Sequence, residues 1–394
     1  MKLLQINSTC GFGSTGRIAV DILNTVTENS GDGIICYGRG TASSGVRSYK
    51  TGNEMLVKIH GVLSRITDRQ GFYSTKATKD LIRKIEEYNP DIIHLHNIHG
   101  YYLDVRVLFD YLKKCGKPVV WTLHDCWAFT GHCAYFTLSG CEKWQTGCSN
   151  CPSKKEYPQS LICDNSKKNY LEKKELFTGL ANMTLVTPSV WLKELVGKSF
   201  LGEYPVKVIN NGINIDVFKP TESDFRKKYS IENKKIFLGV ASVWEERKGL
   251  GDFIKLADLL KEDEKLILVG LTGKQISELP NGIIGIERTE SARELAEIYS
   301  AADVFLNPTY EDNYPTTNLE AISCGTPVVT YETGGSPESL SNGRGISVEV
   351  GDIEAMYNAA QTLVGVKTDN PGEFDARKKY SEYEELYKNL LAKK

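Results

Sequence analysis

Residues 307–329, NPTYEDNYPTTNLEAISCGTPVV, decide the fold of the second half of the chain. An apolar run, DVFL, precedes this stretch and predicts a buried strand, and the last residues of the stretch predict the next strand. A helix is expected between them, because Thr316 or Thr317 can cap its start, and Cys324 and Gly325 fit its end. This βαβ pattern places the loop residues at the carboxyl ends of strands, where open α/β sheets bind ligands.

Polar side chains gather at that predicted edge. They are Glu311, Asp312, Thr316, Thr317 and Glu320. The first amides of a helix have no acceptor within the helix and favour a negative charge, so they can bind a phosphate. We therefore expect a combined phosphate and carboxylate site in this stretch.

The composition is typical of a soluble α/β protein with two domains of similar size. The chain has 394 residues, which exceeds what a single core usually organises, and 41% of them are hydrophobic. A formal net charge of −2 gives no reason to expect nucleic acid as a partner. The first residues lack the pattern of a signal peptide, and no apolar run reaches about 18 residues, so we expect a cytoplasmic location.

Three lysine pairs raise the question of membrane contact. They are Lys154-Lys155, Lys167-Lys168 and Lys173-Lys174. Such pairs could let the protein rest on the anionic inner face of a membrane. Solvated helix faces are the simpler interpretation, so peripheral membrane contact is a secondary expectation.

A glycine-rich loop, GFGSTG at residues 11–16, lies between a predicted strand and a helix predicted from Arg17 to Thr27. Its G-x-G-x-x-G spacing is typical of dinucleotide sites. Those sites also need an acidic residue after the second strand, where this chain has Gly38 and Arg39. The loop is therefore expected to let the backbone approach a phosphate or a sugar, with a purely structural turn as the alternative. The candidate binding residues are Gly13, Ser14, Thr15 and Gly16.

Two further predicted strands end in polar residues. His94 and His96 lie on one face of a strand predicted at 92–97, and His94 is expected to be a hydrogen-bonded core residue because that strand should be buried on both sides. The strand predicted at 118–125 ends in His124 and Asp125. His124 can bind a substrate hydroxyl or, with the neighbouring carboxylate, move a proton, and an ordinary loop histidine is the alternative. The candidate cleft residues after the first of these strands are His96, Asn97 and His99.

An insertion at residues 126–163 contains six of the ten cysteines. Without a secretory signal, a metal site is a better interpretation than a disulfide framework. The pair Cys148-x-x-Cys151 could bind a structural zinc together with Cys133 and Cys141. The alternatives are buried thiols, a redox pair, or substitute ligands among Cys126, His132 and Cys163.

A second basic motif lies in the second half of the chain. Arg247 and Lys248 follow a predicted strand at 235–241 and precede a predicted helix, so they are candidates to bind a pyrophosphate; a surface basic pair is the alternative. A charged helix is predicted at 381–391. Tyr380, just before it, and Tyr383, Tyr387 and Leu391 within it are spaced to form an apolar stripe.

Taken together, these motifs resemble those of retaining nucleotide-sugar glycosyltransferases of family four. They include the glycine loop, Thr122-x-His124-Asp125, NNGIN at 210–214, RKG at 247–249, the stretch from Asn307 to Pro327, and GGSPE at 334–338. The resemblance covers nearly the whole chain. The cysteine-rich insertion is similar to that of a bacterial subgroup that builds surface or capsular polysaccharides of the colanic-acid type.

The resemblance implies a GT-B fold, in which two Rossmann-like domains face a central cleft. The expected domains are 1–212 on the acceptor side, 213–375 for the nucleotide-sugar donor, and 376–394 as a helix that packs back on the first domain. The implied reaction moves a sugar, with retention, from a nucleotide-diphosphate sugar to a glycan or lipid-linked acceptor, and requires no cofactor, so a zinc would be structural.

The resemblance also implies roles for individual residues. Lys248 would bind the donor diphosphate, Glu320 the ribose hydroxyls, and His124 the transferred sugar. The implied catalytic set is His124, Asp125, Lys248, Glu311 and Asp312, and the implied donor set adds the glycine loop, Arg247, Thr316, Thr317 and Glu320.

Two departures from the family pattern leave questions open. The arginine usual after the first strand of the second domain is absent, so Arg247 would replace its charge. The usual pair of glutamates lies eight residues apart, which gives Asp312, whereas Glu311 is nine residues before Glu320. The alternative functions are a sugar-nucleotide epimerase or hydrolase on the same fold, an NAD-type oxidoreductase, and a binding protein without catalysis.

Overall fold

A computed structural model describes residues 1–393 of the protein. The chain forms two compact units. The first unit contains residues 1–210 and the residues from 379 onward, and the second contains residues 211–378. Near the points where the chain enters and leaves the second unit, Ile213 and Asp375 lie side by side, and the amide of Ile213 donates to the carbonyl of Phe374 at 2.8 Å.

The first unit is built on a sheet of seven parallel strands in the order β3-β2-β1-β4-β5-β6-β7. The strands are β1 (Lys2–Asn7), β2 (Asp32–Tyr37), β3 (Ser48–Lys50), β4 (Ile92–Leu95), β5 (Val119–Thr122), β6 (Met183–Thr187) and β7 (Val206–Val208). The helices are α1 (Gly13–Glu28), α2 (Glu54–Thr67), α3 (Thr75–Tyr88), α4 (Val105–Cys115), α5 (Ser166–Phe177), α6 (Val190–Lys198) and, from residue 379, α13 (Ala376–Ala392). Helices cover both faces, so the central strands are buried throughout.

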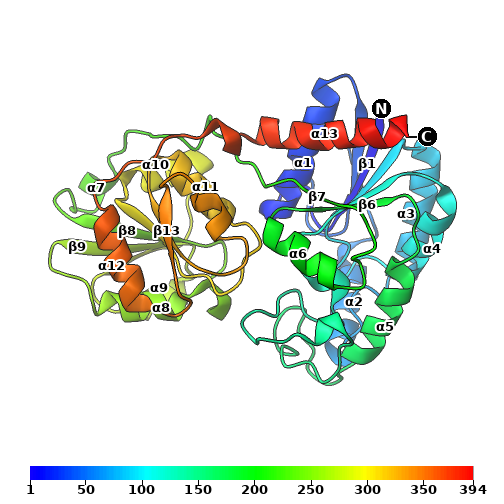
Figure 1. Ribbon diagram of the computed structural model, residues 1–394, viewed down its shortest axis with the longest axis horizontal. Helices are drawn as coiled ribbons and strands as arrows, with labels where there is room; N and C mark the ends of the chain where they lie inside the picture. The colour runs from blue at the N-terminus through cyan, green and yellow to red at the C-terminus, as the bar shows by residue number, and fades with distance from the viewer. Residues whose placement is uncertain (394) are drawn as a thin grey trace. The chain divides into compact units, whose positions relative to one another are not determined.

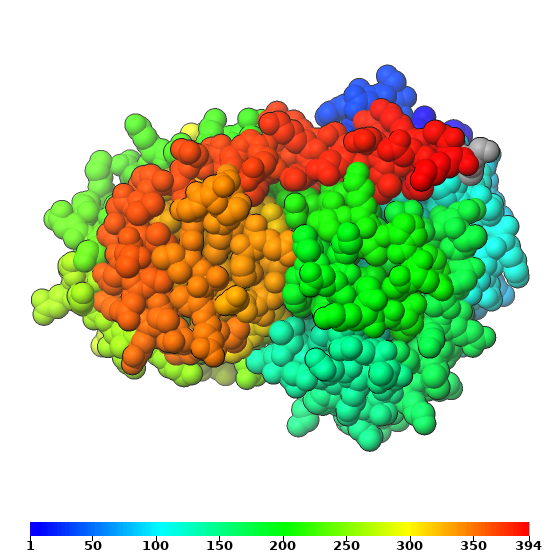
Figure 2. All heavy atoms as spheres, viewed as in Figure 1, coloured from blue at the N-terminus to red at the C-terminus, as the bar shows by residue number. Residues whose placement is uncertain are grey.

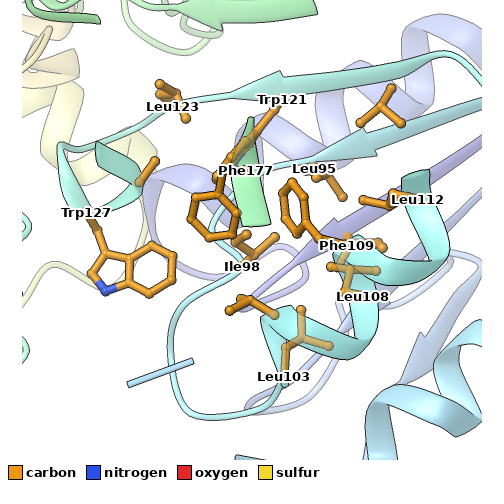
Figure 3. Packing of buried hydrophobic residues seen from close by; sticks show 14 of the residues in the cluster. Leu95, Ile98, Leu103, Leu108, Phe109, Leu112, Trp121, Leu123, Trp127 and Phe177 are labelled. Atoms are coloured by element: carbon orange, nitrogen blue, oxygen red, sulfur yellow. The ribbon is translucent and has the colours of Figure 1, made fainter. Parts of the chain in front are cut away.

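Aromatic side chains fill the core between this sheet and its helices. The ring centroids of Phe109 and Phe177 are 4.4 Å apart, and Phe177 meets Trp121 edge to face at 5.1 Å (Figure 3). Trp127, which follows β5, packs at the margin of the same cluster. This cluster fixes the end of β5, where His124 and Asp125 follow.

Helix α13 returns the chain to the first unit and lies across it beside α1 (Figure 1). Its tyrosine stripe is buried: the hydroxyl of Tyr387 lies 2.7 Å from His94 Nδ1, and that of Tyr383 lies 3.1 Å from Thr122 Oγ1. His94 also bonds to Thr122 through Nε2 at 2.8 Å. The predictions of an apolar tyrosine stripe and of a hydrogen-bonded core histidine are confirmed.

The second unit is built on a sheet of six parallel strands in the order β10-β9-β8-β11-β12-β13. The strands are β8 (Lys235–Val240), β9 (Glu264–Val269), β10 (Ile283–Ile286), β11 (Val304–Asn307), β12 (Val328–Tyr331) and β13 (Gly345–Val348). The helices are α7 (Phe225–Lys228), α8 (Leu250–Ala257), α9 (Gly273–Ser277), α10 (Ala292–Ala301), α11 (Thr316–Ser323) and α12 (Ile353–Leu363). Two parallel sheets confirm the predicted α/β class.

Several boundaries differ from the sequence prediction. Helix α1 begins at Gly13, so the glycine loop forms its first turn instead of preceding it. Helix α11 begins where predicted, but Pro315 occupies its N-cap and no side chain caps it, so the predicted cap by Thr316 or Thr317 is wrong. Helix α12 had no prediction, although Asp352 caps it by accepting from the amide of Ala355 at 2.8 Å.

The cysteine-rich insertion forms a lobe of the first unit with two short 3₁₀ turns, η1 (Trp127–Phe129) and η2 (Lys143–Gln145). It is the blue-green surface at the lower edge of that unit in Figure 2. Stacked rings hold it: the centroids of Phe136 and Trp144 are 5.0 Å apart. Among residues 1–393, no helix combines the length and the apolar character that crossing a membrane requires.

Candidate functional site

Polar residues that follow β4 and β5 surround a small pocket in the first unit. His96 and His124 stack at a centroid distance of 5.4 Å, and His96 Nδ1 lies 3.1 Å from His124 Nε2. The pocket lining also includes Asn97, His99, Asp125 and Trp127. The structure thus brings together all five residues that the sequence placed at this rim.

A chain of buried hydrogen bonds determines which nitrogen of His124 carries a proton. Gln5 donates through Nε2 to the carbonyl of Ala19 at 2.7 Å, which turns its Oε1 toward His96 Nε2 at 2.8 Å. His96 therefore donates from Nε2 and accepts at Nδ1, so His124 must donate from Nε2. Burial lowers the pKa of His124 to about 4 and that of His96 well below its ordinary value, so both rings are neutral near pH 7. His124 consequently presents an unprotonated Nδ1.

Asp125 is paired with His99, although the sequence suggested a partnership with the adjacent His124. Its Oδ2 lies 2.8 Å from His99 Nε2, and its Oδ1 accepts from the amide of Trp127 at 2.9 Å. Burial raises the pKa of Asp125, but His99 and these hydrogen bonds outweigh it and hold that pKa below its usual range. His99 also bonds through Nδ1 to the hydroxyl of Tyr157 at 3.0 Å. His99 and Asp125 are therefore fixed by each other and by the insertion.

The glycine loop of the first unit is a tight turn with an exposed edge. The amide of Gly11 donates to the carbonyl of Gly16 at 3.0 Å, and a Cβ on Gly16 would lie 2.7 Å from Thr9 Oγ1. A side chain at position 16 would therefore displace Thr9, and glycine fits without this change. Gly13 and Ser14 are exposed in the first turn of α1, and Thr15 is half-buried, so their amides are accessible to an anion.

In the second unit, a basic turn is clamped against the end of β11. The turn is η3 (Glu246–Lys248), and Gly249, with φ of +74°, ends it. A Cβ on Gly249 would lie 2.2 Å from the carbonyl oxygen of Pro308, so only glycine fits. The amide of Tyr310 donates to the carbonyl of Arg247 at 2.8 Å. These contacts hold Arg247 and Lys248 beside the loop that follows β11, which is part of the stretch 307–329 that the sequence analysis identified.

Both cations of the turn meet that loop. Lys248 Nζ forms an ion pair with Asp312 Oδ2, and Arg247 donates from Nη1 to the carbonyl of Glu311 at 3.3 Å and from Nε to Glu245 at 3.2 Å. The Lys248 and Asp312 side chains keep about a fifth of their surface exposed. Lys248 is thus held in place but remains accessible to an anion.

Glu320 lies on α11 and is almost fully buried, at 8% exposed. Its Oε2 accepts from the hydroxyl of Tyr299 at 3.1 Å. Burial, followed by the Glu320 charge, raises the pKa of Tyr299 well above its ordinary value, so Tyr299 remains a donor. This bond fixes the direction of the carboxylate. Thr316 and Thr317 begin the same helix and are half-buried.

A network of buried amides joins β11, α11 and the GGSPE loop, and sequence reasoning missed it. Asn307 Nδ2 donates to Asn318 Oδ1 at 2.8 Å, and Asn318 Nδ2 donates to the carbonyl of Ser336 at 3.3 Å. A Cβ on Gly334, at φ of +58°, would lie 1.9 Å from the carbonyl oxygen of Asp312. The only signals in the sequence were one asparagine at the end of the strand and another in the helix that follows it.

The zinc prediction is not supported. Within residues 1–393, no three His, Cys, Asp or Glu side chains are placed to hold a metal ion. The thiols have other partners: Cys133 and Cys151 hydrogen-bond to each other, and Cys148 Sγ accepts from the amide of Gly131 at 3.2 Å. All ten cysteines lie in the described part of the chain and none forms a disulfide there.

Buried neutral histidines make the stability of the first unit depend on pH. Burial lowers the pKa of His60 and of His124 to about 4, against an ordinary value near 6.5. The unfolded chain therefore binds protons first as pH falls, and stability is lost between about pH 6.5 and pH 4. For His60, which accepts from the amide of Gly71, the full loss is roughly 3 kcal/mol.

Urea unfolding followed by tryptophan fluorescence measures this effect, since four of the five tryptophans lie in the first unit. We expect the free energy of unfolding to fall from about pH 7 to pH 5, and to fall less steeply in His60→Asn. Equal slopes in the two proteins would contradict the assignment.

Two family models match the chain. Residues 34–217 match the model described as Glycosyltransferase Family 4, and residues 234–365 match the model described as Glycosyl transferases group 1. The first match lies almost entirely in the first unit, and the second match lies within the second unit. The two matches together span most of the chain.

Individual relatives are more distant. WcaC of Escherichia coli strain K12, named as a glycosyl transferase of colanic acid biosynthesis, is 24% identical over 425 residues, which cover 99% of this chain and 100% of WcaC. The N,N'-diacetylbacillosaminyl-diphospho-undecaprenol alpha-1,3-N-acetylgalactosaminyltransferase of Campylobacter jejuni is 30% identical over 155 residues, covering 36% of this chain and 40% of that enzyme.

Solved structures share the fold over the whole chain. HepE (Alr3699) of Anabaena, solved in complex with UDP, has a TM-score of 0.70 at 16% identity and covers 99% of this chain and 100% of its own. Sucrose-phosphate synthase of Thermosynechococcus elongatus has a TM-score of 0.69 at 15% identity and covers both chains fully. At these identities the likeness concerns the fold alone.

Proposed function

Because this chain belongs to the glycosyltransferases, we propose that it transfers a sugar from a nucleotide-diphosphate sugar to a glycan or lipid-linked acceptor, with retention of the anomeric configuration. Its family 4 match lies at residues 34–217 and its group 1 match at residues 234–365, on a GT-B fold. The observation that carries the proposal is the basic turn held beside the loop that follows β11, where Lys248 pairs with Asp312 and Arg247 donates to the carbonyl of Glu311. HepE was solved with UDP and with UDP-glucose, which supports a nucleotide sugar as donor.

In the proposed reaction, Lys248 stabilises the diphosphate as the bond to the sugar breaks. A preorganised cation at a developing negative charge lowers the barrier, and Arg247 and the first amides of α11 add to the same field. This chemistry needs no metal. Asp312, as the partner of Lys248, positions that cation, which leaves Glu311 as the carboxylate for the transferred sugar.

Glu320 is proposed to accept hydrogen bonds from the ribose hydroxyls. The hydroxyl of Tyr299 fixes the direction of the Glu320 carboxylate, whose two oxygens are both hydrogen-bond acceptors. The first amides of α1, from Gly13 to Gly16, are proposed to contact the phosphate or sugar from the first unit.

His124 is proposed to accept a hydrogen bond from a sugar hydroxyl through its unprotonated Nδ1, and Gln5 and His96 are its positioning residues. Loss of the acceptor on Gln5 frees His96 to reverse its tautomer, which would turn His124 Nδ1 into a donor. Gln5→Leu is therefore expected to lower kcat about tenfold or more. Gln5→Glu should retain most of the activity, because a carboxyl kept protonated by burial donates to the Ala19 carbonyl and keeps an acceptor for His96.

The ¹⁵N chemical shifts of the His124 ring distinguish this effect from a loss of packing. They should exchange between the two nitrogens in Gln5→Leu and stay unchanged in Gln5→Glu. A Gln5→Leu protein with native shifts and native kcat would contradict the role of the relay.

The acceptor and the cellular setting complete the proposal. The names of the two relatives refer to colanic acid biosynthesis and to a diphospho-undecaprenol acceptor, and they support a role in bacterial polysaccharide or glycolipid synthesis. We propose that the protein acts in the cytoplasm, where nucleotide sugars would supply it.

A panel of nucleotide sugars tests the function. Thermal stabilisation should single out one nucleotide class, because a ligand that binds only the folded state raises its stability. Release of the nucleoside diphosphate should then depend on an acceptor. Conversion of the donor to an epimer without any acceptor would support the epimerase alternative, and reduction or oxidation of a nicotinamide would support the oxidoreductase.

A further inference from the structure

Four thiols of the cysteine-rich insertion line one small pocket, and the proposed sugar transfer uses none of them. They are Cys133, Cys141, Cys148 and Cys151. The rings of Phe136 and Trp144 and the imidazole of His132 complete the lining. None of the four thiols forms a disulfide within residues 1–393. The insertion therefore gathers nucleophilic sulfur atoms at a place separate from the pocket that follows β4 and β5.

Two of these thiols are in direct contact. Cys133 donates a hydrogen bond to Cys151, so their sulfur atoms adjoin each other. Cys148 is turned toward Gly131 instead: the amide of Gly131 donates to Cys148 Sγ at 3.2 Å, and a Cβ on Gly131 would lie 2.7 Å from the Cβ of Cys148. The contact pair is thus Cys133 with Cys151, and not the Cys148-x-x-Cys151 pair that is closest along the chain.

The backbone at both members of the contact pair is held in place. The carbonyl of Cys133 accepts from Thr130 Oγ1 at 2.5 Å, and the amide of Cys151 donates to Asp164 Oδ2 at 2.7 Å. A disulfide forms only where the two cysteines already lie close and their Cβ atoms do not point apart. Two thiols fixed in contact meet the first of these conditions without a rearrangement of the insertion.

A buried lysine supports the segment that carries Cys133. Lys173 is 1% exposed, and its Nζ donates to the carbonyls of Trp127 at 2.8 Å and Thr130 at 3.1 Å. It ties α5 to the start of the insertion. Since it cannot reach a membrane, that part of the sequence prediction for the lysine pairs is wrong.

The two thiols of the contact pair differ in access. Cys151 is half-buried, whereas Cys133 is 6% exposed, so a small reagent in solution reaches Cys151 first. His132 lines the same pocket and binds the Asp68 carboxylate through Nδ1. Its Nε2 is buried and has no hydrogen-bond partner among residues 1–393. Because Nδ1 carries the proton toward Asp68, Nε2 is left as an acceptor beside the thiols.

From this geometry we propose that Cys133 and Cys151 form a reversible disulfide when a peroxide oxidises the insertion. The Cys151 sulfur attacks one oxygen of hydrogen peroxide and the O–O bond breaks. Cys151 becomes a sulfenic acid, and its thiol proton leaves with the other oxygen as water. The Cys133 sulfur then attacks the sulfenic sulfur, the S–O bond breaks, and the hydroxide leaves with the Cys133 proton as a second water.

The electron balance of the proposed reaction is simple. The two thiols lose two electrons, and the peroxide gains them. A dithiol reductant restores both thiols by exchange, during which its own sulfur atoms form the disulfide.

The proposed disulfide lies one hydrogen bond away from the residue that holds His99. Ala134, which follows Cys133, donates its amide to the carbonyl of Tyr157 at 3.2 Å. The hydroxyl of Tyr157 lies 3.0 Å from His99 Nδ1. Oxidation would therefore tie together the part of the insertion that packs against the pocket of the first unit.

Peptide mass spectrometry of the full-length protein tests the proposal. After hydrogen peroxide and alkylation, we expect a link between Cys133 and Cys151, which trypsin separates by cleavage at Lys143 and which fragment spectra assign. The pair should oxidise about tenfold or more faster than Cys115, a half-buried thiol outside the insertion. A dithiol should remove the link.

Variants separate the two steps. In Cys133→Ser, the sulfenic acid on Cys151 loses its contact thiol, so dimedone should label Cys151. Cys151→Ser should form no link. Cys141→Ser is the matched control, because it removes a thiol of the same pocket outside the contact pair, and it should form the link as the native protein does. Thermal midpoints of the reduced variants verify that they fold.

Three results would overturn the proposal. One is a link between Cys148 and Cys151 in place of the expected one, and another is oxidation of the pair no faster than that of Cys115. The third is a stoichiometric metal ion that the purified protein releases when its thiols are alkylated, since the thiols would then be ligands and not a free pair. Each of these results can be read without an assay of sugar transfer.

Discussion

Lys248→Ala is expected to lower kcat/KM for sugar transfer about a thousandfold and to leave the fold intact. Removal of one preorganised donor from a developing negative charge typically costs a factor of 10² to 10³ in rate, and Lys248 carries a full charge. The fold should survive because the ion pair with Asp312 is partly exposed and contributes little to stability. Steady-state kinetics with the selected donor, together with a thermal midpoint, measure both quantities.

The chain provides a matched control for this prediction. Lys255 pairs with Asp252 at 3.3 Å on the adjacent helix α8, so Lys255→Ala removes the same kind of side chain from the same kind of partner. It should retain activity within about threefold. Equal loss in the two variants, or near-native activity in Lys248→Ala, would contradict the role of Lys248 at the diphosphate.

Glu320→Gln is expected to weaken donor binding about a hundredfold, because hydrogen bonds to a charged group contribute roughly 1.5 to 3 kcal/mol each. The loss should appear mainly in the KM for the donor and in the Kd of the nucleoside diphosphate. A second comparison changes the ligand. The native protein should bind the deoxyribose analogue of the nucleoside diphosphate more weakly than the ribose form, whereas Glu320→Gln should bind the two equally.

Tyr299→Phe serves as the control for Glu320. It removes the hydrogen bond that directs the carboxylate but keeps the charge, so a smaller loss is expected together with retained preference for ribose. If Glu320→Gln kept the full preference for ribose, another group would have to bind those hydroxyls, and the assignment would be wrong.

The sequence was sufficient to predict an element of the fold where the signal for that element is local and periodic. The strand, loop and helix around α11 follow from an apolar run, a glycine and a proline, and β12 lies within one residue of its predicted place. The burial of His94 followed from its position on a strand covered on both faces. The basic turn ending in Gly249 was found for the same reason.

Contacts between distant residues were not predictable in this way. Asp125 pairs with His99 and not with its neighbour His124, because the two side chains belong to different hydrogen-bond networks after β5. Pro315, and not Thr316 or Thr317, occupies the N-cap position of helix α11. Cysteine spacing suggested a ligand set, and Cys133, Cys141, Cys148 and Cys151 do line one pocket, but spacing does not fix the thiol geometry that a metal ion requires. Such outcomes depend on tertiary packing, which one sequence does not encode in any local pattern.

The identity of the transferred product tests the central claim most directly. The selected nucleotide sugar is incubated with the protein and a membrane fraction that supplies lipid-linked acceptor, and ¹H NMR follows the anomeric proton. We predict one nucleoside diphosphate released per sugar transferred, with the anomeric configuration of the donor kept in the product and no product with Lys248→Ala. Inverted configuration, or a donor consumed at the same rate without acceptor, would contradict the account.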